Sequence, residues 1–316
     1  MVAASKAMWL RVSCGAYLLL LAVTDVAEPL QAALDADGDC QGSDCALSAL
    51  QVRASVEGSC GFSFSDCFAA DQTSSSSLEP LTSLSASLYD DLIMPPPAMN
   101  GTTEDMAALR YNLLANSAST VLTQWSFLSD QNIFAYSAAV GANLERDAPT
   151  LSACIVAFYK PIHALKDYFK EKVKRPRPFV AHPDLKPCLP EEFSFSYPSG
   201  HATFYAATEE LLGAWFPLQR DRIGYVSSSG VGARATCAVH YPSDAHAGRK
   251  LGKMAAIEVM QMPQWQSFVS QPSAKILEEL AAINKSRPYA GLPIFPRMDL
   301  LPNLPYVSTD GTPRMR

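Results

Sequence analysis

The sequence has no excess of basic residues. Its 316 residues include 25 lysines and arginines against 31 aspartates and glutamates, so the net charge is −6 at pH 7. A protein that binds nucleic acid over a broad face usually carries the opposite balance. The composition therefore predicts no nucleic-acid partner. The 48% of hydrophobic residues is enough to form a sizeable core.

Long apolar runs are also scarce. A transmembrane helix needs about 18 or more consecutive apolar residues, and the apolar run at residues 12–23 is shorter than that. Lys6 and Arg11 precede this run, and that order is typical of a cleaved secretory signal, which we expect over residues 1–27. An uncleaved signal anchor is the alternative. After cleavage we expect a soluble, secreted protein, either extracellular or periplasmic.

The eight cysteines fit an oxidising compartment. Cys14 lies in the expected signal. Cys154, Cys188 and Cys237 are scattered, and we expect the last two to pair because they flank two of the motifs described below. The remaining four lie close together, in a segment that we expect to be stapled by disulfides rather than by zinc because it has no histidine and no CxxC spacing. They are Cys40, Cys45, Cys60 and Cys67.

Strict alternation of apolar and polar residues, which marks half-buried strands, is scarce. From residue 103 onward apolar residues recur at the three-to-four spacing of helices. Pro149 suits the first position of one helix, and Pro161 lies inside the same helix as a candidate kink. The pattern predicts an all-α fold with a helical bundle as its core. The expected helices cover 106–125, 133–144, 149–173, 201–215, 222–239, 243–262 and 273–284.

The first of three chemically suggestive motifs is basic. Lys170, Lys174 and Arg177 stand at i, i+4 and i+7, which predicts one shared helix face. Two such cations can grip one phosphate, the arginine with a bidentate fork. The alternative is a solvated basic helix end, which the helix dipole favours in any case.

The second motif is the tetrapeptide at residues 198–201, where an apolar, helix-like run begins. Ser199 is a good N-cap, and Gly200 lets the backbone approach a ligand closely. The free N–H groups of a helix start favour anions, and His201 can donate or accept a proton beside them. The alternative is an ordinary cap followed by a surface histidine.

The third motif spaces Arg234, His240 and Asp244 over eleven residues. The aspartate can bond one ring nitrogen of the histidine and fix its tautomer, which leaves the other nitrogen as a nucleophile. The alternative is a histidine that only caps the following helix.

Together the motifs carry a resemblance. Lys170-x6-Arg177-Pro178, Pro198-Ser199-Gly200-His201 and Arg234-x5-His240-x3-Asp244, in this order, resemble the three-part signature of the type 2 phosphatidic acid phosphatase superfamily, which includes vanadium-dependent haloperoxidases. Tyr-Pro-Ser-Gly-His and the stretch at 243–249 look like the secreted class A non-specific acid phosphatases. The resemblance covers 88–265. It implies a catalytic domain there. Outside it, the polar composition of 28–87 indicates an accessory or pro-segment, and the pattern of 266–316 indicates a terminal helix with a proline-rich tail.

The resemblance implies a metal-independent acid phosphatase that hydrolyses small phosphate monoesters without a cofactor. His240 would be the nucleophile, Asp244 would orient it, and His201 would protonate the leaving alcohol. Ala233 stands where the family usually has serine, so we expect weaker phosphate binding or altered substrate choice. The residues that would hold the phosphoryl oxygens are Lys170, Arg177, Ser199, Gly200 and Arg234.

Other interpretations of the same residues stay open. A vanadium-dependent haloperoxidase would use vanadate in this pocket, and a non-catalytic secreted protein would only bind phosphate there. A homo-oligomer is compatible with either. We expect His163, His182 and His246 to have structural or surface roles, with no metal bound.

Overall fold

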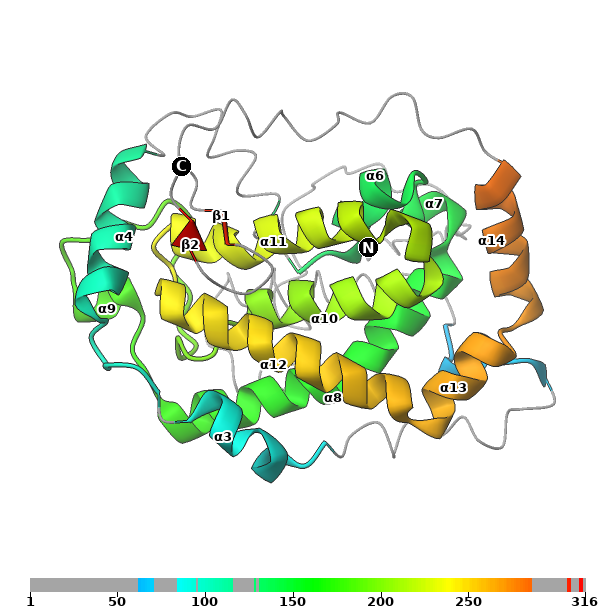
Figure 1. Ribbon diagram of the computed structural model, residues 1–316, viewed down its shortest axis with the longest axis horizontal. Coiled ribbons are helices and arrows are strands. Elements are labelled where there is room, and N and C mark those ends of the chain that lie inside the picture. The colour runs from blue at the N-terminus through cyan, green and yellow to red at the C-terminus, as the bar shows by residue number, and fades with distance from the viewer. Residues whose placement is uncertain are drawn as a thin grey trace, which may run out of the picture.

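The computed structural model describes residues 62–70, 84–94, 96–115, 128, 131–285, 306–307 and 313–314. Helices dominate this part of the chain, so the predicted all-α fold is confirmed (Figure 1). The only strands in it are two pairs of residues that run antiparallel, β1 (Tyr306–Val307) and β2 (Pro313–Arg314). The longer helices are α4 (Thr103–Ala115), α8 (Pro149–Val173), α10 (Gly200–Trp215), α11 (Arg220–Thr236), α12 (Pro242–Gln261), α13 (Pro263–Ser270) and α14 (Ala274–Lys285). The short ones are α3 (Asp90–Ile93), α6 (Ser137–Val140), α7 (Leu144–Asp147) and α9 (Pro178–Ala181), with 3₁₀ turns at Phe64–Cys67, Ala86–Tyr89, Ile133–Tyr136 and Pro217–Gln219.

Helix α10 is the centre of the bundle. It contacts α8, α11 and α12, and Figure 1 shows α11 and α12 on either side of it. Every residue from 200 to 213 is buried, including the polar ones. Most of its residues are small or apolar, as a helix covered on all sides requires, and its two buried glutamates form ion pairs, Glu209 with Lys253 and Glu210 with Arg220.

Two glycines allow α12 to pack closely on α10. A Cβ atom at Gly248 would overlap the carbonyl oxygen of Ser199, and one at Gly252 would overlap the carbonyl oxygen of Thr203. Backbone atoms cannot move aside as the end of a flexible side chain can. The spacing of four residues therefore places both glycines on the face of α12 that holds the start of α10 in place.

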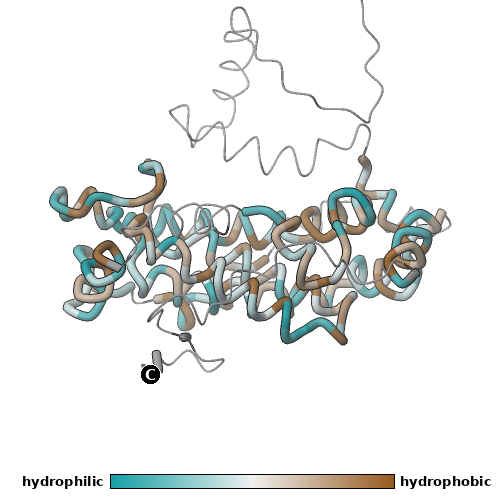
Figure 2. Tube along the Cα trace, turned by 90° about the horizontal axis from the view of Figure 1, so that it is seen from above, coloured by the Kyte–Doolittle hydropathy of each residue, from teal (hydrophilic) through white to brown (hydrophobic). Residues whose placement is uncertain are grey.

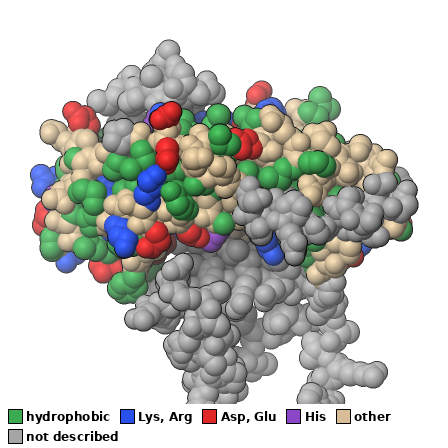
Figure 3. Space-filling view, turned by 90° about the horizontal axis from the view of Figure 1, so that it is seen from below, with side chains coloured by type: hydrophobic (Ala, Val, Ile, Leu, Met, Phe, Trp, Pro, Cys, Tyr) green, Lys and Arg blue, Asp and Glu red, His purple; other side chains and the backbone are tan. Residues whose placement is uncertain are grey.

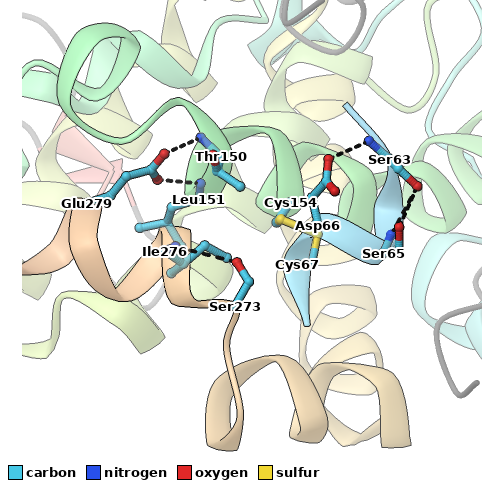
Figure 4. The surroundings of a disulfide bond; sticks show 10 residues. All are labelled: Ser63, Ser65, Asp66, Cys67, Thr150, Leu151, Cys154, Ser273, Ile276 and Glu279. Atoms are coloured by element: carbon cyan, nitrogen blue, oxygen red, sulfur yellow. Dashed lines mark hydrogen bonds between the residues drawn. A yellow bond between two sulfur atoms is a disulfide. The ribbon is translucent and has the colours of Figure 1, made fainter. Parts of the chain in front are cut away.

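The start of α8 is capped by another helix. Pro149 occupies the first position, as predicted, but Ala148 before it has no capping side chain. Instead Glu279 of α14 accepts hydrogen bonds from the backbone N–H groups of Thr150 (2.9 Å) and Leu151 (3.0 Å) (Figure 4). A carboxylate is favourable at a helix N-terminus because of the helix dipole. Helix α8 then runs to Val173 as one element, through Pro161.

A disulfide joins Cys67 to Cys154 in α8 (Figure 4). The expectation that Cys67 belongs to a locally stapled segment was therefore wrong, while Cys40, Cys45 and Cys60 lie outside the described residues. The pairing is explained by packing, because the segment around Cys67 contributes two aromatic rings to the core of the bundle. The aromatic cluster consists of Phe64, Phe68, Phe158, Trp265 and Phe268.

The single helix expected over 133–144 was also wrong. The chain forms a 3₁₀ turn and α6, and then breaks at Gly141, where φ is +82°. Asn143 starts α7 anew by accepting a hydrogen bond from the backbone N–H of Arg146 (3.0 Å). A residue in the left-handed conformation ends one helix, and a capping residue after it begins another, even where apolar residues continue at helical spacing. Helix α11 ends at Thr236 rather than 239, α4 ends at Ala115, and residues 116–125 and the expected signal lie outside the described residues.

On the side of the molecule seen in Figure 3, acidic and basic side chains are intermixed, and neither sign of charge forms a face of its own. Along the helices, hydrophilic and hydrophobic residues alternate in short stretches, as in other amphipathic helices packed into a bundle (Figure 2). No helix in the described residues has the length and apolar character to cross a membrane.

The close contact between α10 and α12 predicts a cost for one added methyl group. Gly252→Ala should lower the free energy of unfolding by about 1–3 kcal/mol, because the new Cβ meets backbone. Gly232→Ala in α11 is the matched control: apart from its chain neighbours and the backbone of its own helix, no atom lies within 4 Å of its Cβ position, so alanine should be neutral or stabilise by up to about 1 kcal/mol. Urea denaturation of both variants measures the difference. Equal stabilities would contradict close packing at Gly252.

Candidate active site

The three motifs meet where four helix ends come together. The last turns of α8 and α11 and the first turns of α10 and α12 lie at the same end of the bundle, on the left in Figure 1. Chain segments separated by up to 74 residues, from Lys170 to Asp244, are thereby brought to one place.

Asp244 connects these segments. One carboxylate oxygen accepts a hydrogen bond from Arg175 (2.5 Å), and the other accepts from Ser196 Oγ (2.5 Å) and the backbone N–H of Tyr241 (2.8 Å). Its backbone carbonyl accepts from the N–H of Ser199 (3.0 Å). The side chain is fully buried, and burial raises the pKa of Asp244 although Arg175 and the two other donors oppose this. A single residue thus contacts all three motifs.

His240 lies between this carboxylate and the cations. Its Nδ1 is 3.4 Å from Asp244 Oδ2 and 3.3 Å from Ser196 Oγ, and its Nε2 is 2.8 Å from a guanidinium nitrogen of Arg177. Burial lowers the pKa of His240 well below its usual value, and Arg177 and Lys170 lower it further. With Nδ1–H facing the carboxylate, the lone pair of a neutral ring lies on Nε2, toward the cations.

Arg177 reaches the site from outside α8. The prediction of one helix face for Lys170, Lys174 and Arg177 was wrong, because α8 ends at Val173 and Lys174 follows it in the left-handed conformation, with φ of +53°. Lys174 is exposed, and its nearest carboxylate is that of Glu171 at 3.9 Å. The turn directs Arg177 inward, where it is 2% exposed and donates to the carbonyls of Ser194 (2.7 Å) and Val239 (2.8 Å).

Lys170 is the second buried cation, in the last turn of α8. Its ammonium group donates to the carbonyl of Phe195 and lies 3.5 Å from Ser194 Oγ. Burial lowers the pKa of Lys170 well below its usual value, and the neighbouring charges of Arg177 and Lys166 lower it further. A cation that is costly to keep charged is stabilised by an incoming anion.

Arg234 is the third buried cation, at 4% exposure, and it shares one carboxylate with Arg177. Glu192 accepts a hydrogen bond from Arg177 (2.7 Å) through one oxygen and from Arg234 through the other. The two arginines hold the pKa of Glu192 well below its usual range, although its burial acts in the opposite direction. The site therefore holds an ionised carboxylate between two of its cations.

The second motif forms the start of α10, as predicted. Ser199 is the N-cap, and its Oγ accepts a hydrogen bond from the N–H of Ala202 (3.3 Å). A Cβ at Gly200 would lie 3.2 Å from the side chain of Lys166, so the lysine stem covers this turn. His201 is 7% exposed, and burial and Arg234 lower its pKa well below the usual value. Within the described residues no hydrogen bond holds its ring.

The comparison with known protein families is consistent with this geometry. Residues 149–268, from the start of α8 into α13, match the PAP2 superfamily. The chain carries a PAP2 superfamily domain. All three motifs lie inside the match, so the superfamily resemblance inferred from them is confirmed.

Two curated relatives extend the similarity beyond the PAP2 domain. The non-specific acid phosphatase of Salmonella typhi is 26% identical over 233 residues, which cover 67% of this chain and 88% of the relative. The non-specific acid phosphatase of Salmonella typhimurium is 26% identical over 232 residues, with the same coverage of both chains.

Sequence reasoning missed three residues of the PAP2 domain site: Arg175, Glu192 and Ser196. Arg175 is fully buried and also donates to Ser243 Oγ (2.8 Å) and to Asp105 of α4 (3.2 Å). Its guanidinium lies 4.1 Å from the ring centre of Tyr241. Arg175 was visible as part of the basic motif, but nothing in its spacing separates an arginine that holds a carboxylate from one that holds a ligand.

The predicted Cys188–Cys237 pair is confirmed. The bond attaches the loop that carries Glu192 to the end of α11, and the N–H of Cys188 also donates to the carbonyl of Cys237 (3.1 Å). Ala233, beside Arg234, is fully buried against the same disulfide. The loop and the arginine of the PAP2 domain are thereby fixed to each other.

The other histidines have partners away from His240. His163 Nδ1 lies 3.0 Å from Asp167, and His182 Nε2 lies 2.7 Å from the backbone oxygen of Asn100. His246 is on the exposed side of α12, as expected. Among the described residues, no three histidine, cysteine, aspartate or glutamate side chains are grouped so that they could hold a metal ion.

The buried Arg175 predicts a large effect on stability. Arg175→Met leaves Asp105 and Asp244 without their shared counter-charge, so the free energy of unfolding should fall by about 3–5 kcal/mol. Arg222→Met, at an exposed position of α11, is the control and should change it by less than about 0.5 kcal/mol. Chemical denaturation at neutral pH checks both values. If Arg175→Met lowered the free energy of unfolding as little as the control does, the buried ion pairs of Arg175 would not be needed for stability.

Proposed function

We propose that the protein is a secreted acid phosphatase of the class A type, which hydrolyses small phosphate monoesters through a phosphohistidine. The observation that carries the proposal is the position of His240. Its Nδ1 faces a buried carboxylate while its Nε2 points at Arg177, so its reactive nitrogen faces the cations that would hold a phosphoryl group. The PAP2 domain and the two acid phosphatase relatives support the same reaction class.

In the first step, His240 Nε2 attacks phosphorus and the bond from phosphorus to the ester oxygen breaks. The departing alkoxide takes a proton from His201, so an alcohol leaves and a phosphoramide bond remains. Asp244 stabilises the positive charge that develops on the His240 ring because it faces Nδ1. No hydrogen bond in the described part of the chain holds the His201 ring, so the ring can turn its proton toward the ester oxygen. Because the pKa of His201 is lowered, this acid form is present only at low pH.

In the second step, water attacks phosphorus and His201 takes a proton from that water. The phosphorus–nitrogen bond breaks, inorganic phosphate leaves, and both histidines return to their starting states. One histidine thus acts as acid and then as base, while the other forms and releases the covalent intermediate.

The phosphoryl oxygens would be held by side-chain and backbone donors. Lys170, Arg177 and Arg234 supply positive charge, and the first turn of α10 supplies N–H groups beside Ser199 and Gly200. Charge that spreads over three oxygens in the transition state is stabilised by such fixed donors. We therefore propose that the reaction needs no metal or other cofactor.

Secretion is part of the proposal. Both disulfides of the described residues, Cys67–Cys154 and Cys188–Cys237, are of a kind that persists in oxidising compartments. The basic residues and apolar run at the N-terminus support a secretory route to such a compartment.

Substitution of the nucleophile tests the mechanism. His240→Ala should lower kcat for an aryl phosphate by about 10³-fold or more, because the covalent route is lost. His246→Ala, on the exposed side of α12, which begins two residues after His240, is the control and should retain wild-type turnover. Undiminished turnover by His240→Ala would contradict the proposal. Wild-type halide oxidation with vanadate and peroxide, without phosphatase activity, would instead support the haloperoxidase alternative.

The pH dependence tests the two histidine roles separately. His240 must be neutral to attack, and its lowered pKa keeps it neutral into the acid range. His201 must be protonated to serve as acid, and its lowered pKa means that this form is lost at a lower pH than usual. Accordingly, kcat/KM should rise and then fall with pH, with both limbs on the acid side of an ordinary histidine. A maximum above pH 7 would contradict this assignment.

A further inference from the structure

The carboxylate of Glu192 lies where a phosphoryl group would be expected to bind. Its two oxygens accept hydrogen bonds from two different arginines, Arg177 (2.7 Å) and Arg234. A phosphate held by the same arginines would use the same donor atoms. Glu192 and an incoming phosphoryl group therefore compete for the arginine pair.

Arg234 depends on Glu192 more than Arg177 does. Arg177 donates to three backbone or hydroxyl groups besides Glu192. Glu192 is the one hydrogen-bond acceptor of Arg234 within the described residues, and the buried Nε of Arg234 has no partner there. An anion with more than two oxygens could use the donor that Glu192 leaves unpaired.

Glu192 has a route out of the site. It lies in the irregular segment between α9 and α10, its side chain is 24% exposed, and both Glu191 and Phe193 beside it face solvent. The Cys188–Cys237 bond holds the base of the segment. The side chain can therefore turn toward water without moving the elements that carry the arginines.

We propose that Glu192 is a specificity-determining residue, a built-in competitor that occupies the arginine pair in the free enzyme and is displaced by the phosphoryl group. This rests on the proposed phosphatase function. A terminal phosphoryl group offers the arginines three non-ester oxygens, one more than the carboxylate that it displaces, whereas a phosphodiester offers two and has no such advantage. Glu192 thus favours terminal phosphoryl groups over phosphodiesters, and by competing with inorganic phosphate for the arginines it limits inhibition by the released product.

Displacement also couples binding to a proton. In the free site the surrounding positive charges keep Glu192 ionised, with its pKa well below the usual range. Once phosphate holds the arginines, Glu192 loses these partners and faces an anion, so its pKa rises. Between the two pKa values a proton is taken up on binding, and phosphate binds more tightly as pH falls. The charged and titratable groups that face Glu192 are Lys170 of α8, Arg177 before α9, His201 of α10 and Arg234 of α11.

Calorimetric titration with inorganic phosphate tests this for the whole protein and for Glu192→Gln. We expect the variant to bind phosphate at least about tenfold more tightly, as for the removal of a competing charged hydrogen bond. Repeating the titration in two buffers of different ionisation enthalpy counts protons, and the variant should take up fewer than the wild type. Glu191→Gln removes an exposed charge from the same segment and should match the wild type in both measurements.

Unchanged or weaker phosphate binding by Glu192→Gln would overturn the proposal. Such a result would mean that Glu192 positions the arginines for phosphate rather than competing with it. Glu192→Ala provides a second test if the amide variant is poorly folded. Failure of wild type and both variants to bind phosphate would overturn it too. Failure of the proposed function would look different. In that case Glu192→Gln would still bind phosphate more tightly than the wild type, but the wild type would not hydrolyse an aryl phosphate.

Discussion

The buried contact between Asp244 and its donors is the interaction on which the site depends. Its carboxylate and carbonyl groups join the basic segment after α8, the loop before α10, the cap of α10 and the start of α12. A carboxylate at this depth is stable only when its charge is balanced, and Arg175 provides the balance for Asp244 and also for Asp105 of α4. The same carboxylate fixes the ring of His240, so structural support and proposed chemistry share one residue.

The scaffold concentrates positive charge next to this balanced pair. Lys170, Arg177 and Arg234 are each at most 6% exposed, and Glu192 is the carboxylate that contacts two of them among the described residues. Removing these cations from water is unfavourable without an anion. The site therefore favours anions through burial itself, and the glycine contact between α12 and α10 keeps the helix start within reach. Affinity and specificity then depend on how easily the internal carboxylate is replaced.

Much of this could be predicted from sequence where the cause is local. Ser199 caps α10 and Pro149 starts α8 because the preferences of these residues act within one turn. The resemblance of the three motifs to one superfamily predicted that these distant residues meet. The rest depends on contacts that spacing does not encode. The left-handed conformation of Lys174 separates Arg177 from the helix face. Glu192 becomes part of the site only because the fold places two arginines around it. Cys67 pairs with Cys154 because aromatic packing brings the two segments together.

The covalent intermediate is the most direct test of the account. Purified protein mixed with an aryl phosphate carrying labelled phosphorus should be quenched within a single turnover, and the labelled peptide should be mapped. The account predicts an alkali-stable, acid-labile phosphoramide on His240, formed and lost at rates that match turnover. Rapid hydrolysis with no labelled histidine, or label on another residue with the same kinetics, would contradict it.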